Sequence, residues 1–403
     1  PALMSFFELD QLIKFSKESD RWKAMFDYLH EFTKTHRKGI ACVSLAVFVI
    51  SLYGISKITT NYHIEHNLPI GSKITKDFKF FEAHFSGFRP FELAITAKGD
   101  RHANDYEVVR EMDKIEQHLR TYDCIRAVSS ITTIYKSINQ MNSGDALNAY
   151  HLAENKEAFD QASYLAAKLP QATANVLLSK DKKKARIATR IKDLGADTVK
   201  RIGYEIDTWI AANIDTNLLR VQRTGTGLLL DKNSEYVRND TVLGIFISVG
   251  IISILMAFVL KNVWTILIFL IPNLLPLVIC GAFMGFAHIE LEAGVAIVFD
   301  VIFGIAVDDT IHTISKFRVF LKKGLTVDDA LYETLHEVGK PMFQTALILF
   351  FGFLVMLFSA SPPSINIGLL MSFTLASALA SDVFLLPVLV RWLLKEKTKV
   401  AHP

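Results

Sequence analysis

The chain of 403 residues has little cysteine and little net charge. Its three cysteines are Cys42, Cys124 and Cys280, and two of them lie inside apolar runs, so the sequence contains no disulfide framework. The formal net charge of +3 does not favour a nucleic-acid-binding surface. Pro1–Asp20 has no basic segment followed by an apolar core, which argues against a signal peptide there.

Apolar residues, by contrast, are abundant. They make up 51% of the chain, and the mean hydropathy is +0.28. Residues 60–237 hold most of the charge, whereas residues 240–395 consist mainly of long apolar runs. This asymmetry predicts an α-helical polytopic membrane protein with one inserted extramembrane domain.

Six stretches approach the ~20 apolar residues that a helix needs to cross the hydrocarbon core. They are Gly39–Ile55, Val242–Leu260, Trp264–Phe286, Leu291–Ile314, Met342–Ala360 and Ile365–Trp392. The first is short, but Lys38 and Lys57 at its ends can extend to the two interfaces. The last is longer than necessary, so we expect it to leave the membrane near Pro387 or Arg391.

These stretches divide the chain into five parts. We predict a cytoplasmic linker at residues 1–38, a membrane helix at 39–55, an extracytoplasmic α+β domain at 56–238, a five-helix membrane bundle at 239–395 and a cytoplasmic tail at 396–403. Basic residues gather before the first stretch and between the fourth and fifth, whereas Ala287–Glu290 is acidic and Ser361–Ser364 is uncharged. Because basic loops stay inside, both termini are expected in the cytoplasm.

The inserted domain has the pattern of a split βαβ fold. The expected elements are strand Phe91–Ala97, helix Asp105–Tyr122, strand Cys124–Ser129, strand Ala185–Ile191, helix Asp197–Ile214 and strand Leu218–Gln222. This order predicts a ferredoxin-like domain, with at least one further helix around Asp145–Leu169 in the spacer Ile131–Lys180. We expect Thr224-Gly225-Thr226-Gly227 to be a loop; it lacks the Lys-Ser/Thr of a phosphate-binding loop.

The fourth stretch carries an unusual set of polar residues. Asp300, Gly304, Asp308 and His312 recur every four residues and therefore share one helical stripe, while Asp309 lies about 100° round from Asp308. Gly304 lets another helix approach closely. A charged, unpaired carboxylate in the apolar core costs at least several kcal/mol. The adjacent pair Asp308 and Asp309 is therefore a candidate proton carrier.

A structural role is the alternative for each of these residues. Asp308 and Asp309 would then only lock the helices together by hydrogen bonds. Asp300 is as well explained by a place near the outer surface, and His312 by a place near the cytoplasmic interface. Asp382, in the sixth stretch, is a second intramembrane acid, with a hydrogen bond to Ser or Thr of another helix as its structural explanation.

Gly304-Ile-Ala-Val-Asp308-Asp309 matches the GxxxDD motif, and through it the sequence resembles the RND (resistance-nodulation-division) superfamily, in particular its MMPL-type and hopanoid-exporter-like transporters. Supporting residues are Thr345, Gly352-Phe353, Ser359 and Asp382…Leu386-Pro387, with Asn67-Leu-Pro69, Asp77, Phe81, Phe85-Ser-Gly87 and Pro90-Phe91-Glu92 at the start of the insert. The resemblance implies export of hydrophobic or lipid-like substrates driven by the proton-motive force. It also implies a proton relay by Asp308 and Asp309, assisted by His312 and Asp382, and a porter domain in the insert.

The resemblance also bears on partners. Members usually have two such halves, and this chain has one, which implies a C-terminal half in which Pro1–Leu3 ends a preceding span and Met4–Lys34 is the linker. The partner is then an N-terminal half, covalent or separate, or a second copy, in a bacterial inner membrane. The expected ligands are protons, membrane lipids and a lipid-like substrate, without nucleic acid. A Patched-like sterol or lipid sensor without transport is the alternative. We see no metal-ligand cluster and no nucleophile elbow, so no cofactor and no enzyme activity are predicted.

Overall fold

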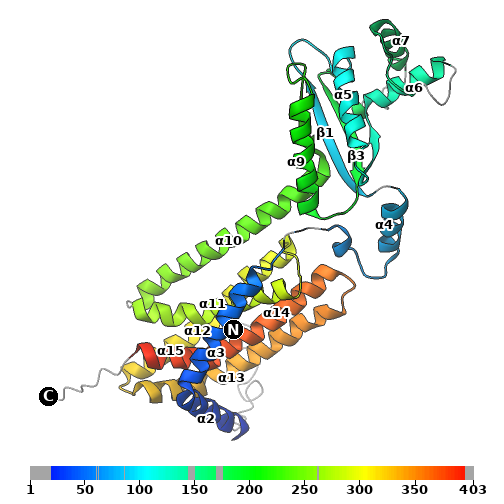
Figure 1. Ribbon diagram of the computed structural model, residues 1–403. Coiled ribbons are helices and arrows are strands. Elements are labelled where there is room, and N and C mark those ends of the chain that lie inside the picture. Colours follow the sequence, from blue (N-terminus) through cyan, green and yellow to red (C-terminus); the bar gives the residue numbers. More distant parts are fainter. Residues whose placement is uncertain are drawn as a thin grey trace, which may run out of the picture. The chain divides into compact units, whose positions relative to one another are not determined.

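The structure is a computed structural model that describes residues 20–59, 61, 63–85, 87–143, 150–168, 176–260 and 263–394. The expectations for Pro1–Leu3 and for the tail at 396–403 lie outside these residues. The chain forms two compact units (Figure 1). The helical unit comprises Pro1–Thr59, Asn239–Ser359 and Ser364–Pro403, and the α/β unit comprises Thr60–Arg238 and Ala360–Pro363.

The helical unit is built from long helices joined by short turns. Its elements are α2 (Asp20–Thr35), α3 (Arg37–Ile55), the C-terminal part of α10 (Gly225–Leu260), α11 (Val263–Phe286), α12 (Ala293–Lys322), α13 (Val327–Leu354), the 3-10 turn η3 (Val355–Phe358), α14 (Pro362–Ala380), the π-helical segment η4 (Ser381–Leu385) and α15 (Leu386–Leu393). Because each helix satisfies its own backbone hydrogen bonds, such a unit suits a hydrocarbon environment.

Five helical stretches among the described residues are long and apolar enough to cross a membrane. They are Arg37–Ile55, Gly225–Ala257, Ile268–Phe286, Val327–Phe358 and Pro362–Leu393. The sequence predicted six. The remaining stretch corresponds to α12, which is 30 residues long but carries Asp300, Asp308 and Asp309 among its apolar residues. Length and composition therefore support five of the six predicted spans.

Two helices begin far earlier than their apolar runs. The loop predicted at Thr224–Gly227 is wrong, because β4 ends at Thr224 and α10 begins at Gly225. Gly225 has a φ of +89°, and a Cβ at Gly227 would overlap the carbonyl oxygen of Pro90, so both glycines serve a tight strand-to-helix turn. Likewise α13 begins after Thr326, whose Oγ1 caps the helix by accepting the Asp329 N–H at 3.2 Å.

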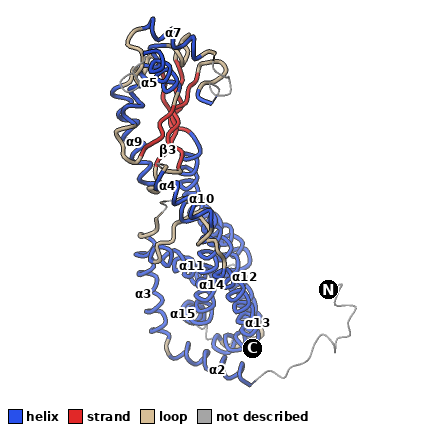
Figure 2. The backbone as a smooth tube through the Cα atoms, turned by 90° about the vertical axis from the view of Figure 1, so that its right-hand side faces the viewer, coloured by secondary structure: helices blue, strands red, loops and turns tan. Residues whose placement is uncertain are grey.

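The α/β unit holds all four strands of the described chain, drawn in red in Figure 2. Strands β1 (Arg89–Ala97), β2 (Ile125–Ser129), β3 (Lys184–Ile191) and β4 (Leu219–Thr224) form an antiparallel sheet of order β2-β3-β1-β4. The helices are α4 (Lys73–His84), α5 (Tyr106–Leu119), α6 (Ile131–Ser143), α7 (Lys156–Ala166) and α9 (Ala196–Asn213). The strands and helices predicted in the insert are confirmed to within a few residues.

One apolar core holds this unit together. Burial alternates along β1, and its inward residues include Leu93 and Ile95, both fully buried. They belong to one cluster with Met112 of α5 and Ile206 of α9, so both helices cover the same face of the sheet. The helix predicted around Asp145–Leu169 is present as the shorter α7; residues 145–149 and Leu169 lie outside the described part, and residues 150–155 are not helical.

Candidate functional site

The π-helical segment η4 interrupts the last apolar stretch and presents Asp382 to the interior of the helical unit. Across from it, α11 contains both Pro272 and Pro276. Because Pro276 has no N–H, the carbonyl of Pro272 lacks its usual intrahelical donor. The hydroxyl of Ser381 donates to that carbonyl at 2.9 Å. The proline pair of α11 thus fastens the π-helical segment beside it, and such segments often mark functional sites.

Asp382 is buried in a polar cluster formed by three helices. Its side chain is 6% exposed, Thr310 of α12 is 0% exposed and Asn273 of α11 is 1% exposed. The hydroxyl of Thr310 lies 2.9 Å from Asp382 Oδ1, 3.2 Å from Asn273 Oδ1 and 3.1 Å from the carbonyl of Ala306. A hydroxyl has one proton, so it donates to one of these three acceptors at a time. We call Asp382, Thr310 and Asn273 the buried triad.

The predicted stripe of α12 lies on the opposite, open side of the helix. The side chains of Asp308 and His312 are 72% and 70% exposed, and His312 Nε2 lies 3.5 Å from Asp308 Oδ1. Asp300 and Gly304 are exposed as well. A Cβ at Gly304 would meet no atom within 4 Å, so the close helix approach expected there is not seen among the described residues of this chain.

Asp309 is intermediate in exposure between Asp308 on the open side of α12 and Asp382 in the buried triad. It is half-buried, and it interacts electrostatically with Asp308 on the open side and with Asp382 in the buried triad. Thr313 donates to its backbone carbonyl at 2.9 Å. His312 interacts electrostatically with Asp309, as the sequence led us to expect, and it also forms an ion pair with Asp308. Asp309 is thus the carboxylate of the motif that connects the surface to the interior.

The sequence analysis missed a further polar cluster, which holds the amphipathic helix α2. The guanidinium of Arg391, whose side chain is 2% exposed, donates to Asp328 at 2.7 Å and to Thr33 at 3.0 Å, and it lies 3.4 Å from His30 Nδ1. Burial, and after it the charge of Arg391, lower the pKa of His30. Phe26 is 1% exposed and packs its ring against Gly339 of α13.

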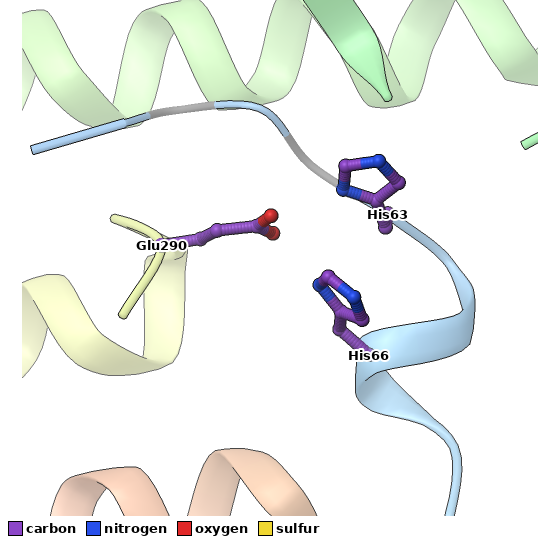
Figure 3. Close-up of side chains that lie close together, drawn as sticks. All are labelled: His63, His66 and Glu290. Atoms are coloured by element: carbon purple, nitrogen blue, oxygen red, sulfur yellow. The ribbon is translucent and has the colours of Figure 1, made fainter. Parts of the chain in front are cut away.

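Two histidines of the α/β unit also escaped the sequence analysis. His63 and His66 stand on either side of the start of the 3-10 turn η2 (Glu65–Asn67), and their ring centroids are 4.7 Å apart (Figure 3). Glu290, drawn in the same figure, belongs to the helical unit and lies in the turn between α11 and α12. The spacing of three residues between the two histidines was the only signal in the sequence.

Two comparisons with known proteins bear on this arrangement. The family model described as the MMPL family matches residues 100–399, which is most of the chain and includes the buried triad and the motif of α12. The Methanocaldococcus jannaschii protein MJ1562, which is named as a membrane protein, is 24% identical over 361 residues. This alignment covers 86% of the present chain and 89% of MJ1562.

Proposed function

The chain belongs to the MMPL family of the RND superfamily, as its GxxxDD motif predicted, and from that premise we propose that it exports hydrophobic or lipid-like molecules in exchange for entering protons. Members of this family are transporters. The observation that carries the proposal is the hydrogen bond of 2.9 Å between Thr310, next to the motif, and the buried carboxylate of Asp382. A carboxylate at such a depth is a functional residue by default.

The buried triad has two hydrogen-bond arrangements that differ by one proton. When Asp382 is charged, it accepts the hydroxyl proton of Thr310. When Asp382 is protonated, it donates to Thr310, whose own proton then turns to Asn273 Oδ1, 3.2 Å away. The two states differ by one charge, and a charge that crosses the full transmembrane potential changes in free energy by ~2.3 kcal/mol per 100 mV. Since ~1.4 kcal/mol is a tenfold change, this suffices to drive the exchange in one direction.

We assign the first step of the relay to Asp308 and Asp309. Asp308 and His312 are exposed on the open side of α12, whereas Asp309 is half-buried and interacts electrostatically with Asp382. A proton accepted on the open side of α12 would reach the buried triad through Asp309. This assignment makes α12 the sixth membrane span. In this proposal α12 keeps its carboxylates inside the membrane because the relay needs them. The membrane is a bacterial inner membrane, and both termini lie in the cytoplasm.

We assign substrate collection to the α/β unit. Its element order β-α-β-β-α-β and strand order β2-β3-β1-β4 support the ferredoxin-like fold of a porter domain. Helices α6 and α7 are additions between the two βαβ halves. On the outer side of the membrane, such a domain would take lipid-like molecules from the outer leaflet.

A partner is needed to complete the relay. The exposed stripe of Asp308, His312 and Gly304 would otherwise face lipid, where an ion pair is costly. A second helical bundle, from an N-terminal half or from a second copy of this chain, would cover it. The alignment covers 89% of MJ1562, so a chain of comparable extent occurs in that relative.

The decisive experiment measures proton flux and export together. The full chain, purified with any bound partner, is reconstituted in liposomes with a pH gradient, trapped pyranine and a nitrobenzoxadiazole-labelled phospholipid as the lipid-like probe. Asp309→Asn and Asp382→Asn should each abolish probe-dependent proton flux, because they keep the shape of the side chain and remove its titration. Asp300→Asn, the same change on an exposed residue of the same helix, is the matched control.

Two outcomes would count against the proposal. Proton flux that persists in both variants would leave the carboxylates with a structural role only. Probe binding without any coupled flux in the unmodified protein would instead favour a lipid sensor that does not transport.

A further inference from the structure

A small cavity lies directly against Asp382, between α12, α13 and the last helix of the helical unit. Its volume is about 30 Å³. Two further polar residues belong to its lining, Thr313 of α12 and Thr334 of α13, and the rest of the wall is apolar, with Phe317, Leu335, Val338 and Pro387 among its residues. The cavity therefore borders Asp382 of the buried triad, while its other lining residues lie outside the triad.

The size and chemistry of this cavity suit water. A cavity needs at least ~10–15 Å³ to hold one water molecule, which then requires two to four polar partners. The hydroxyl proton of Thr313 is engaged with the carbonyl of Asp309 at 2.9 Å, and that of Thr334 with the carbonyl of Ala330 at 2.6 Å. Both threonine oxygens therefore remain as acceptors, which together with Asp382 are three polar partners for one or two waters.

The residues that line the cavity lie toward the turn between α12 and α13. Its lining comes from the C-terminal half of α12 and the N-terminal half of α13, which are joined by the turn at residues 323–326. Lys316, Lys322 and Lys323 lie around this turn, on the side that the loop charges assign to the cytoplasm. Asp309, by contrast, does not belong to the cavity lining, although it interacts electrostatically with Asp382.

We propose that this cavity is a water site through which Asp382 releases its proton toward the cytoplasm, with Thr334 and Thr313 as positioning residues. The inference rests on the proposed function, since it supplies the exit step of that relay. The O–H bond of the Asp382 carboxyl breaks as a cavity water accepts the proton, and this water then gives one of its protons to a solvent water on the side of the turn at residues 323–326. No group is oxidised or reduced, and Asp382 is left as the carboxylate that accepts from Thr310.

Infrared spectroscopy tests this step without any substrate. The unmodified full chain in liposomes is transferred from H₂O to D₂O at a pD low enough to show the carboxyl C=O band that Asp382→Asn removes. The time course of its downshift reports deuterium exchange at that carboxyl group. Thr334→Leu fills the cavity and should slow this exchange at least about tenfold, because water then reaches Asp382 only when the helices open.

The matched control is Thr345→Val, also on α13, whose hydroxyl makes the same bond to the carbonyl four residues earlier but is exposed. It should exchange at the unmodified rate. If Thr334→Leu does not fold, Thr334→Val removes the hydroxyl without added volume and should slow exchange by a smaller factor. Exchange at the unmodified rate in each folded Thr334 variant would overturn the inference.

The result is separable from the proposed function. Loss of the exchange effect, with Asp309→Asn still abolishing coupled flux, would remove only the water route. Slow exchange in Thr334→Leu, with unaffected flux in Asp309→Asn and Asp382→Asn, would keep the water site and reject the proton relay.

Discussion

The docking of α2 on the helical unit gives a sharp quantitative prediction. Arg391 lies at the end of the last helix and bonds to Asp328 of α13 and Thr33 of α2. Arg391→Met keeps most of the side-chain volume and removes both bonds. Because the side chain of Asp328 is 37% exposed and Lys34 lies 3.9 Å from it, Asp328 is left solvated and near another cation. The loss of docking free energy is therefore smaller than it would be for a buried charge left without a partner.

The size of the effect follows from these contacts. A hydrogen bond to a charged group contributes about 1.5–3 kcal/mol. The bond to Asp328 is partly replaced by water, and a methionine side chain restores some apolar packing. We therefore expect a loss of ~2 kcal/mol in the docking free energy of α2, which is a factor of ~30 in its undocking equilibrium.

Hydrogen–deuterium exchange of the full chain in detergent measures this effect. Amides of Asp20–Thr35 should exchange about 30-fold faster in Arg391→Met if exchange proceeds through undocking. Lys316→Met is the control, because it removes an ion pair with Glu337 in which both side chains are nearly half exposed, a kind worth ~0–1 kcal/mol. Exchange of α2 within twofold of the unmodified rate in Arg391→Met would refute the reasoning, as would an equal acceleration in Lys316→Met.

Two further predictions concern the α/β unit. His118 stacks on Trp209 with ring centroids 3.9 Å apart, and burial lowers its pKa below the ordinary value of 6.5, so quenching of Trp209 fluorescence by the protonated ring should have its midpoint below 6.5. Since the unfolded state then binds the proton more tightly, the contribution of His118 to the free energy of unfolding is fully present above pH 6.5 and is lost as the pH falls through the folded pKa. His118→Phe should therefore flatten this dependence of stability on pH. A quenching midpoint above 6.5 would contradict the assignment. Gly227→Ala should lower the melting temperature of this unit by an amount equivalent to ~1–3 kcal/mol, because the added methyl group overlaps Pro90. Gly39→Ala is the control and should not lower the melting temperature, because open space surrounds Gly39. Equal melting temperatures for the two variants would contradict the close approach of Gly227 to Pro90.

The α/β elements were predictable because their signals are local. The alternating burial of Arg89–Ala97 follows its apolar pattern, and the spacing of Val108, Met112 and Ile115 marks one face of α5. Each element is amphipathic over its own length, so neighbours in sequence suffice to identify it. The observed ends differ from the predicted ends by only a few residues.

The helical unit was less predictable because an apolar run marks only the part of a helix that lies in lipid. Helices α10 and α13 continue into polar sequence, where hydropathy gives no sign of them. Helix α2 is polar on average, and its signal was the amphipathic spacing of Trp22, Phe26 and Leu29. The π-helical segment depends on the prolines of α11, which lie more than a hundred residues away in sequence.

The acidic residues of the site could be identified from the sequence, but their hydrogen-bond partners could not. Asp382 stood out as an acid inside an apolar stretch, but its partner Thr310 is a residue type that helices carry without special function. The cross-helix bond spans 72 positions of sequence, so neither spacing nor periodicity reveals it. Asn273 escaped notice for the same reason.

The rotation of α12 decides which residue of the motif does what. Successive residues of an α-helix are turned by about 100°, so Asp308, Asp309 and Thr310 point in three directions. The first is 72% exposed, the second half-buried and the third fully buried. The two acids of the motif and the residue that follows them are therefore increasingly buried along the series, and the most buried group is the hydroxyl of Thr310. Because that hydroxyl reaches Asp382 in η4, a proton change at Asp309 would, under the proposed function, alter the contact between α12 and η4 and so couple charge to the movement of these helices.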